Sequence, residues 1–169
     1  ETARLVWELL KTEKPLVLDA DGINAFETHI PEIKRRQGKV TVMTPHEGEF
    51  FRAGGDLSRG RESGARAYAA RWGVYLILKG HRTIVAAPDG RLAVNTTGNS
   101  GMAKGGSGDV LAGMFAALLC QMPARDAVQT AVWLHGRAGD LCAGRMGEYA
   151  MNPTDVIAAL PEVTKPIIR

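Results

Sequence analysis

Residues 98–109 read GNSGMAKGGSGD, and an apolar run from Val110 to Leu119 follows directly. Five of these twelve residues are glycines, which allow a sharp turn and bring backbone N–H groups close to a ligand. The helix predicted to begin here adds unpaired N–H groups and the positive end of a dipole, so the expected ligand is a phosphate. A carboxylate at Asp109 would repel a bound phosphate. Its position is explained if the carboxylate acts as a base in the reaction. A phosphate cradle beside a base indicates phosphoryl transfer to a hydroxyl group.

Each half of this interpretation has a simpler alternative. A segment rich in glycine and serine is also typical of a flexible surface connection. The helix start directly after Gly108 favours the phosphate cradle instead. An acid in the first turn of a helix also stabilises the helix dipole without doing any chemistry. For Asp109 the residues alone leave both roles open.

Three short apolar runs upstream of this loop have the pattern of buried parallel strands. Each run ends in polar residues: 16–18 in Asp19 and Asp21, 40–43 in His46, and 74–78 in Lys79. The alanine-rich segment 61–72 has a helical period, and strands that alternate with helices predict an α/β fold. Ligands of open α/β sheets bind at the carboxyl ends of the strands. We therefore expect these polar side chains to line one cleft, with the glycine loop nearby.

A hairpin is predicted before the glycine loop, with strands at 83–87 and 92–95 around the turn Pro88-Asp89-Gly90-Arg91. Two long helices, 108–120 and 124–143, follow the loop. The last helix begins at Asn152, with Pro153 in its first turn. Gly139-Asp140 stands inside the second long helix and is interpreted as a site of close helix packing, because glycine otherwise weakens a helix. The sequence shows no linker and no repeat, so 1–169 is predicted to be a single domain.

Composition limits the classes of function. The chain of 169 residues carries a formal net charge of +3. Its one basic run, Lys34-Arg35-Arg36, is interpreted as a solvated surface turn, so we expect no nucleic-acid partner. No apolar segment reaches the length of a membrane span, and no signal peptide is present, so we expect a cytoplasmic protein without a membrane partner. Cys120 and Cys142 are predicted to be core thiols of a reducing compartment.

Several familiar ligand motifs are missing. There is no Gly-Lys-Ser/Thr of a P-loop and no Gly-x-Gly-x-x-Gly after a strand. His46-Glu47 begins like a zinc-protease motif, but Phe50 stands where the second histidine belongs. We expect no metal bound by protein side chains alone.

Four motifs, in this order, also resemble a known family: DADGIN (19–24), TPHEGE (44–49), KGHRT (79–83) and GNSGMAKGGSGDVLAG (98–113). Together they resemble the ADP/ATP-dependent NAD(P)H-hydrate dehydratases, which repair hydrated nicotinamide cofactors. The resemblance spans residues from about 15 to about 155, and the glycine motif is the most specific part. It implies a ribokinase-like α/β fold: a mostly parallel central sheet flanked by helices on both faces, with the hairpin before the glycine loop.

The resemblance implies dehydration of hydrated NADH or NADPH, with ADP or ATP as the co-substrate and Mg²⁺ at its phosphates. ADP is the expected nucleotide, since bacterial members favour it. The hydroxyl of the hydrate would be phosphorylated, and phosphate would then leave, which restores the nicotinamide ring. Asp109 would be the catalytic base, and both His46 and Asp109 would contact the substrate. The expected nucleotide-binding residues are Lys79, Gly80, His81, Arg82, Thr83, Asn99, Gly105, Gly106, Ser107 and Gly108.

The sequence departs from the family pattern in three ways. Glu47 stands where many relatives have proline, and Ser107 where many have threonine. The family domain also has an N-terminal portion with further strands and substrate glycines, which we expect this chain to lack. A homo-oligomer and a fused or separate epimerase domain are left open as partners. Two other functions remain as alternatives: a small-molecule kinase for a vitamin or a sugar, with the same fold, and an inactive nucleotide-binding module.

Overall fold

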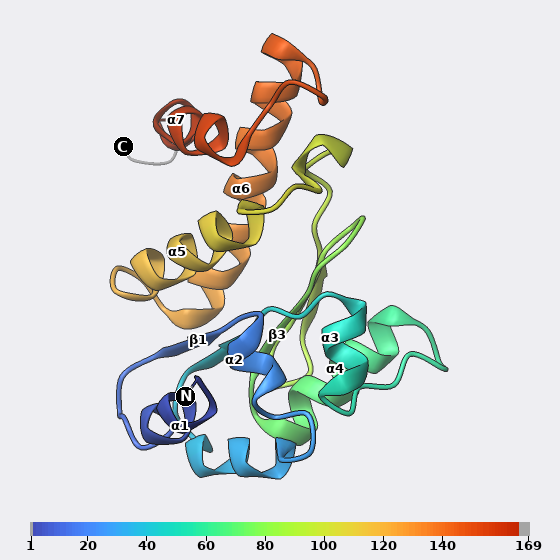
Figure 1. Ribbon diagram of the computed structural model, residues 1–169, viewed down its shortest axis with the longest axis vertical. Helices are drawn as coiled ribbons and strands as arrows, with labels where there is room; N and C mark the ends of the chain where they lie inside the picture. Colours follow the sequence, from blue (N-terminus) through green and yellow to red (C-terminus); the bar gives the residue numbers. More distant parts are fainter. Residues whose placement is uncertain (1, 166–169) are drawn as a thin grey trace. The chain divides into compact units, whose positions relative to one another are not determined.

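The computed structural model describes residues 2–165, and the chain divides into two compact units between Val94 and Asn95 (Figure 1). We refer to the part up to Val94 as unit 1 and to the part from Asn95 as unit 2. The expectation that 1–169 is a single domain stays a prediction. Each unit is described by itself below.

Unit 1 is built around a five-stranded sheet in the order β1-β2-β3-β4-β5. The strands are β1 (Leu16–Leu18), β2 (Thr41–Met43), β3 (Tyr75–Leu78), β4 (Ile84–Ala86) and β5 (Leu92–Val94). The first three pair in parallel, with Val17 opposite Val42 and Met43 opposite Leu76. The hairpin adds two antiparallel pairs, so the sheet is mixed. All five predicted strands are confirmed to within two residues.

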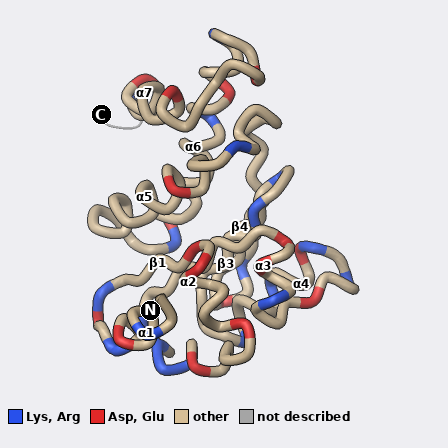
Figure 2. Tube along the Cα trace, viewed as in Figure 1, with Lys and Arg blue, Asp and Glu red and all other residues tan. Residues whose placement is uncertain are grey.

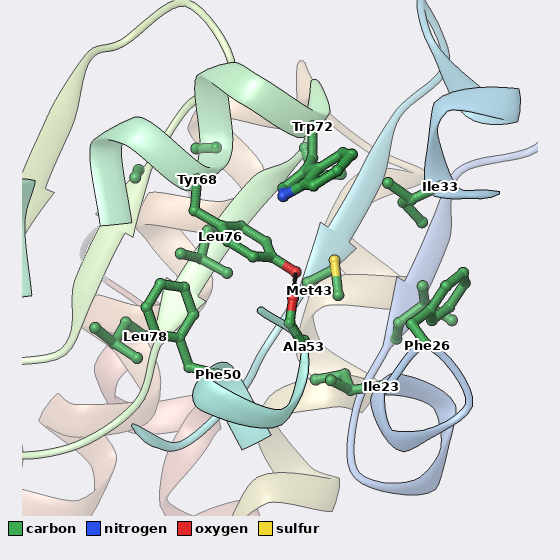
Figure 3. Packing of buried hydrophobic residues seen from close by; sticks show 14 of the residues in the cluster. Ile23, Phe26, Ile33, Met43, Phe50, Ala53, Tyr68, Trp72, Leu76 and Leu78 are labelled. Atoms are coloured by element: carbon green, nitrogen blue, oxygen red, sulfur yellow. Dashed lines mark hydrogen bonds between the residues drawn. The ribbon is translucent and has the colours of Figure 1, made fainter. Parts of the chain in front are cut away.

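Helices cover one face of this sheet. They are α1 (Thr2–Leu9), α2 (Asp21–Asn24), the 3₁₀ helix η1 (Ile30–Arg36), α3 (Glu47–Arg52) and α4 (Arg61–Trp72). Figure 3 shows their apolar side chains, including Ile33, Phe50 and Trp72, packed with Met43 and Leu76 of the strands. The only dashed bond in that view joins the Tyr68 hydroxyl to the carbonyl of Ala53, at 3.1 Å. This core holds the carboxyl ends of β1, β2 and β3 in register.

Alternate strand residues point to the opposite face, and they are apolar too. Val42, Ile77 and Val85 are almost completely buried. A strand with apolar residues on both sides reads as a continuous apolar run, as these do. The sequence pattern therefore identified the interior strands correctly.

The basic run 34–36 was wrongly predicted to be a solvated turn. Lys34 and Arg35 are exposed, but Arg36 is among the most deeply buried side chains of unit 1. Its guanidinium donates to Thr41 Oγ1 at 2.8 Å and to the backbone carbonyls of Thr12, Lys14 and Val40 at 2.7–3.0 Å. Arg36 is buried because it satisfies carbonyl groups at the amino ends of the strands.

Unit 2 contains the short 3₁₀ helix η2 (Ser100–Met102) and three longer helices, α5 (Ser107–Leu119), α6 (Ala124–Met146) and α7 (Pro153–Thr164). The predicted start of α7 is confirmed, because the Asp155 carboxylate accepts the N–H of Asn152 at 2.8 Å. The α6–α7 contact is apolar and includes Ala138, Cys142 and Val156. Cys142 is thus a core thiol as predicted, whereas Cys120 is exposed.

The charged residues are spread over the chain. Lys and Arg positions alternate with Asp and Glu positions along the trace of both units (Figure 2). Within residues 2–165, no helix is both long enough and apolar enough to cross a membrane.

Candidate functional site

The glycine loop of unit 2 forms a left-handed turn that leads into α5. Gly106 is the N-cap residue, with φ 93° and ψ −19°, and it offers no side chain to cap the helix. Among the described residues, the backbone N–H groups of Gly108 and Asp109 have no hydrogen-bond partner. The side chain of Asp109 is exposed beside them. A helix start with uncapped N–H groups and an accessible carboxylate can hold an anion next to a base.

The first part of the loop rests on α6 through Asp140. The Asp140 carboxylate accepts the Gly98 N–H at Oδ2 (3.0 Å) and the Asn99 side-chain amide at Oδ1 (3.1 Å). Asn99 Oδ1 in turn accepts the Gly101 N–H at 3.1 Å. The prediction of close packing at Gly139-Asp140 missed this role of Asp140. No local pattern around Asp140 points to a loop more than forty residues away.

The second part of the loop is fastened to the segment after α6. Lys104 Nζ donates to the backbone carbonyls of Tyr149 (2.7 Å) and Met151 (2.5 Å). The Ser100 hydroxyl donates to Glu148. The ammonium group of Lys104 is therefore occupied by carbonyl groups and acts as a brace for the loop.

A buried histidine of α6 lies against the first residue of α5. His135 is 8% exposed, and its ring makes a backbone hydrogen bond at Ser107. Burial lowers the pKa of His135 to about 4, against the smaller opposing effect of that bond. Among the described residues, His135 Nε2 has no hydrogen-bond partner. The imidazole is therefore neutral at neutral pH, and His135 is a buried residue of unit 2.

In unit 1, the carboxyl ends of the three parallel strands meet in a network of charges. Lys79, which follows β3, lies 2.7 Å from Asp19 Oδ1 after β1 and 3.9 Å from Glu49 Oε2 after β2. Glu49 is 7% exposed at its side chain. The structure thus brings Asp19 and Lys79 together as predicted, and Glu49 is a member that the sequence did not reveal. Asp21 is exposed and belongs to the first turn of α2.

His46 is the N-cap of α3 and forms a reciprocal pair with Glu49. His46 Nδ1 accepts the Glu49 N–H at 3.3 Å, and Glu49 Oε2 accepts the His46 N–H at 2.9 Å. An Nδ1 that accepts a hydrogen bond carries no proton, so a neutral His46 has its proton on Nε2. The side chain is 55% exposed. Nε2 can therefore donate to a ligand from a fixed ring.

The predicted nucleotide-binding turn 79–83 is held in shape by Arg61 of α4. The Arg61 guanidinium donates to the carbonyls of His81 (2.9 Å) and Lys79 (3.2 Å), and its Nε lies 2.8 Å from Glu47 Oε1. Arg82 has a left-handed backbone with φ 57°, and Ala20 has φ 46° and ψ −119°. Non-glycine residues in these regions are uncommon and occur often at functional sites.

A surface hollow of about 540 Å³ lies beside this turn in unit 1. It is lined by Arg59, Gly60, Arg61, Glu62, Ser63, His81, Arg82, Ile84 and Val94. Arg61 is already paired with Glu47, but Arg59 and Arg82 against the single acid Glu62 favour an anionic ligand. Among the described residues, no group of three or more His, Cys, Asp or Glu side chains could hold a metal ion.

The predicted site residues are therefore found in two sets. His46 and Lys79–Thr83 belong to unit 1, and Asn99, Gly105–Gly108 and Asp109 belong to unit 2. In unit 1, Glu49 contacts both His46 and Lys79. In unit 2, these residues follow one another in the loop that leads into α5. That both sets serve one reaction stays a prediction.

Comparison with known proteins gives consistent relatives. The family model described as NAD(P)H-hydrate dehydratase matches residues 1–162. A relative from Moorella thermoacetica, the bifunctional NAD(P)H-hydrate repair enzyme Nnr, is 41% identical over 170 residues, which are 97% of this chain and 32% of that protein. The chain spans between 26% and 46% of the length of four curated relatives that it matches.

Two solved structures resemble the chain over nearly its whole length. The ADP/ATP-dependent NAD(P)H-hydrate dehydratase from Bacillus subtilis, co-crystallised with ATP/Mg²⁺, has a TM-score of 0.81 and 34% identity, and covers 94% of this chain and 57% of that one. A ribokinase-like superfamily protein from Enterococcus faecalis has a TM-score of 0.82 and 30% identity, and covers 97% of this chain and 58% of that one.

Proposed function

Since this chain belongs to the NAD(P)H-hydrate dehydratase family, we propose that its whole protein dehydrates hydrated NADH or NADPH with the help of a nucleotide. The chain has the ribokinase-like α/β fold of its structural neighbours. The observation that carries the proposal is the junction of the glycine loop with α5. There, N–H groups without partners in the described chain adjoin the exposed carboxylate of Asp109.

The proposed reaction begins with phosphoryl transfer. Asp109 accepts a proton from the hydroxyl of the hydrate, which attacks the terminal phosphate of ADP or ATP. Backbone N–H groups of Gly105–Gly108 stabilise the negative charge that develops on the phosphate. The ring nitrogen then expels the phosphate that has been attached to the ring. Loss of a proton from the ring carbon next to the one that carried the phosphate then restores the dihydronicotinamide ring.

The residues of unit 1 bind the two ligands in this proposal. The half-exposed side chain of His46 donates to the hydrate, and the turn 79–83 binds the nucleotide next to the basic hollow. Lys79 supports this turn in our proposal, since its ammonium group is paired with Asp19 and its N–H donates to the carbonyl of Pro45 at 2.8 Å. Asn99 and Ser107 belong to the nucleotide loop of unit 2, and Ser107 is largely buried at the start of α5.

Magnesium suits this arrangement without a dedicated protein cage. Mg²⁺ commonly keeps several waters and is bound through substrate phosphates and one or two carboxylates. Because Asp109 is the base in this proposal, Mg²⁺ would be held through the phosphates of the nucleotide and its own waters. When bound, Mg²⁺ neutralises charge on the phosphates of the nucleotide.

Other parts of the proposal rest on the relatives. ADP is the preferred nucleotide in our proposal, because one relative from Neisseria meningitidis is named as ADP-dependent. A second activity, in a fused or partner epimerase domain, is proposed because several relatives are named bifunctional repair enzymes. A cytoplasmic location and a homo-oligomer stay predictions.

The test uses the whole protein with hydrated NADH and either ADP or ATP. The expected result is recovery of the NADH absorbance, with ADP the better co-substrate. Asp109→Asn should keep nucleotide affinity and lower the rate at least about a hundredfold, the usual contribution of a general base. Asp126→Asn is the matched control, since Asp126 also lies exposed in the first turn of a long helix.

Two outcomes would contradict the proposal. Stable phosphorylation of a vitamin or sugar alcohol, without recovery of NADH, would identify a kinase of the same fold. Nucleotide binding that Asp109→Asn leaves unchanged, without turnover by the wild type, would identify an inactive binding module.

A further inference from the structure

The glycine loop lies directly against one face of α6. A Cβ atom at Gly136 would lie 2.3 Å from Thr97 Oγ1 and 2.7 Å from the Thr97 carbonyl carbon. A Cβ atom at Gly139 would lie 2.3 Å from Met102 Sδ. All three distances are shorter than any ordinary contact. The backbone of α6 is therefore the surface on which residues 97–102 rest.

On this surface, hydrogen bonds fix the position of the loop. The Thr97 hydroxyl donates to the carbonyl of Trp133 at 3.0 Å. About two turns further along the same helix, the two oxygens of Asp140 accept the Gly98 N–H and the Asn99 side-chain amide. Each oxygen of Asp140 accepts one of these bonds. The side-chain oxygen of Asn99 in turn accepts the Gly101 N–H, which fixes the position of Gly101.

A carboxylate is the group that this position requires. Both groups that face it are N–H donors, so an acceptor at both oxygens satisfies them, and hydrogen bonds to a charged acceptor are the stronger kind. An asparagine at this position would oppose one donor with another. Gly98 has φ 100°, a backbone conformation that glycine adopts without strain.

We propose that Asp140 is a positioning residue, which holds Gly98 and Asn99 so that the glycine loop has its phosphate-binding shape before the nucleotide arrives. Asp140 does not touch the substrate in this proposal and acts through the loop. Preformed N–H donors stabilise a transition state without reorganisation at the moment of reaction. The inference rests on the proposed function, since it assigns a support to that same site.

This assignment changes the role of Asn99. Its side-chain carbonyl is occupied by Gly101, and its amide donates to Asp140. Asn99 therefore serves the nucleotide loop by shaping it. Asn99 and Asp140 belong to one chain of hydrogen bonds, so removing either side chain should disturb the same contacts.

The test compares Asp140→Asn with Asp126→Asn in the whole protein. Asp140→Asn should lower kcat at least about tenfold, because small displacements of positioned groups cost one to two orders of magnitude. The KM for the nucleotide should change by less than the kcat does. Asn99→Ala should lower kcat as well, and the double variant should be no worse than Asp140→Asn alone, because both act through the same contact.

A spectroscopic readout separates this proposal from the fate of the proposed function. In ¹H–¹⁵N spectra without substrate, the Gly98 amide proton should move upfield in Asp140→Asn far more than in Asp126→Asn, since it loses a carboxylate acceptor. The affinity for ADP should also fall in Asp140→Asn if the glycine loop binds ADP. Neither measurement requires dehydratase activity, so both can be made even if the wild type shows none.

Two results would overturn the assignment. The first is a folded Asp140→Asn protein whose Gly98 amide resonance matches that of the wild type. The second is a shifted Gly98 resonance with kcat and ADP affinity both within twofold of the wild type, which would make the contact purely structural. If Asp140→Asn does not fold, Asn99→Ala with the same two readouts decides the matter.

Discussion

Lys79 Nζ lies 2.7 Å from Asp19 Oδ1, so the cation that follows β3 is neutralised by the acid that follows β1. Both side chains are largely buried, at 23% and 15% exposure. Glu49 Oε2 is a second acid at 3.9 Å. The ion pair joins the ends of two strands between which β2 lies, and it therefore helps to define this edge of the sheet.

Asp19→Asn should lower the free energy of unfolding by about 2 kcal/mol, because a hydrogen bond to a charged group is lost from a largely buried place. A double-mutant cycle with Lys79→Met should give a coupling of about 1–2 kcal/mol in urea unfolding. The matched control is the exposed pair of Lys11 and Glu8, whose coupling should stay below about 0.5 kcal/mol. Equal coupling in both pairs would refute the structural role of Lys79.

Ala20→Gly should stabilise the protein by about 1 kcal/mol. Ala20 has φ 46° and ψ −119°, a strained combination for a residue with a Cβ atom, and glycine adopts it freely. Ala25→Gly is the control, since Ala25 is helical with φ −57° and should lose about 0.5–1 kcal/mol on the same change. Chemical denaturation of the two variants measures the difference. A loss of stability in both would show that Ala20 is not strained.

Gly136→Ala and Gly144→Ala should have opposite effects, although both glycines belong to α6. The added methyl group at Gly136 meets the backbone of Thr97, and overpacking of this kind costs about 1–3 kcal/mol. At Gly144 the space is open, so alanine should gain up to about 1 kcal/mol of helix propensity. Thermal unfolding of both variants tests this. Similar melting temperatures would be inconsistent with the contact between α6 and Thr97.

His135 should make stability depend on pH in mildly acidic solution. Its pKa is about 4 in the folded protein, below the ordinary value of 6.5, so between these values the unfolded chain binds the extra proton. Stability from this residue is complete above pH 6.5 and is lost as the pH falls toward 4. Linkage puts the total at about 3 kcal/mol, as an order of magnitude.

The measurement for His135 is urea unfolding of the wild type and His135→Gln from pH 4 to pH 7.5. The variant should show a flatter pH dependence in this range, whatever its stability at pH 7.5. His29→Gln is the control, because His29 is exposed. Parallel curves for the wild type and His135→Gln would contradict the assignment.

The sequence predicted the elements of this fold well where local chemistry decides them. The strand at Leu16–Leu18 and the helix Arg61–Trp72 have the predicted bounds, because an apolar run and a helical period are local signals. The start of α7 was equally clear from Asn152 and Pro153. The antiparallel pairing of β4 with β5 followed from the turn at 88–91.

Residues whose role depends on distant backbone groups could not be predicted in the same way. Arg36 is buried because carbonyls from residues 12, 14 and 40 converge on it, and Asp140 faces a loop that lies about forty residues earlier. Neither arrangement has a signature in the neighbouring sequence. Lys79 was expected at the nucleotide, but its pairing with Asp19 is known only once β1 and β3 are placed in the sheet.

Compared with two alanines, Gly136 and Gly139 together lower the intrinsic stability of the helix α6 by about 2 kcal/mol. A redesign that scored each helix by itself would choose alanine at both positions and would report a more stable protein. The same redesign would push Thr97 and Met102 off the helix and deform the turn in front of them. Efforts to raise the heat tolerance of this protein should therefore begin at open glycines such as Gly113 and Gly144, and leave this pair as it is.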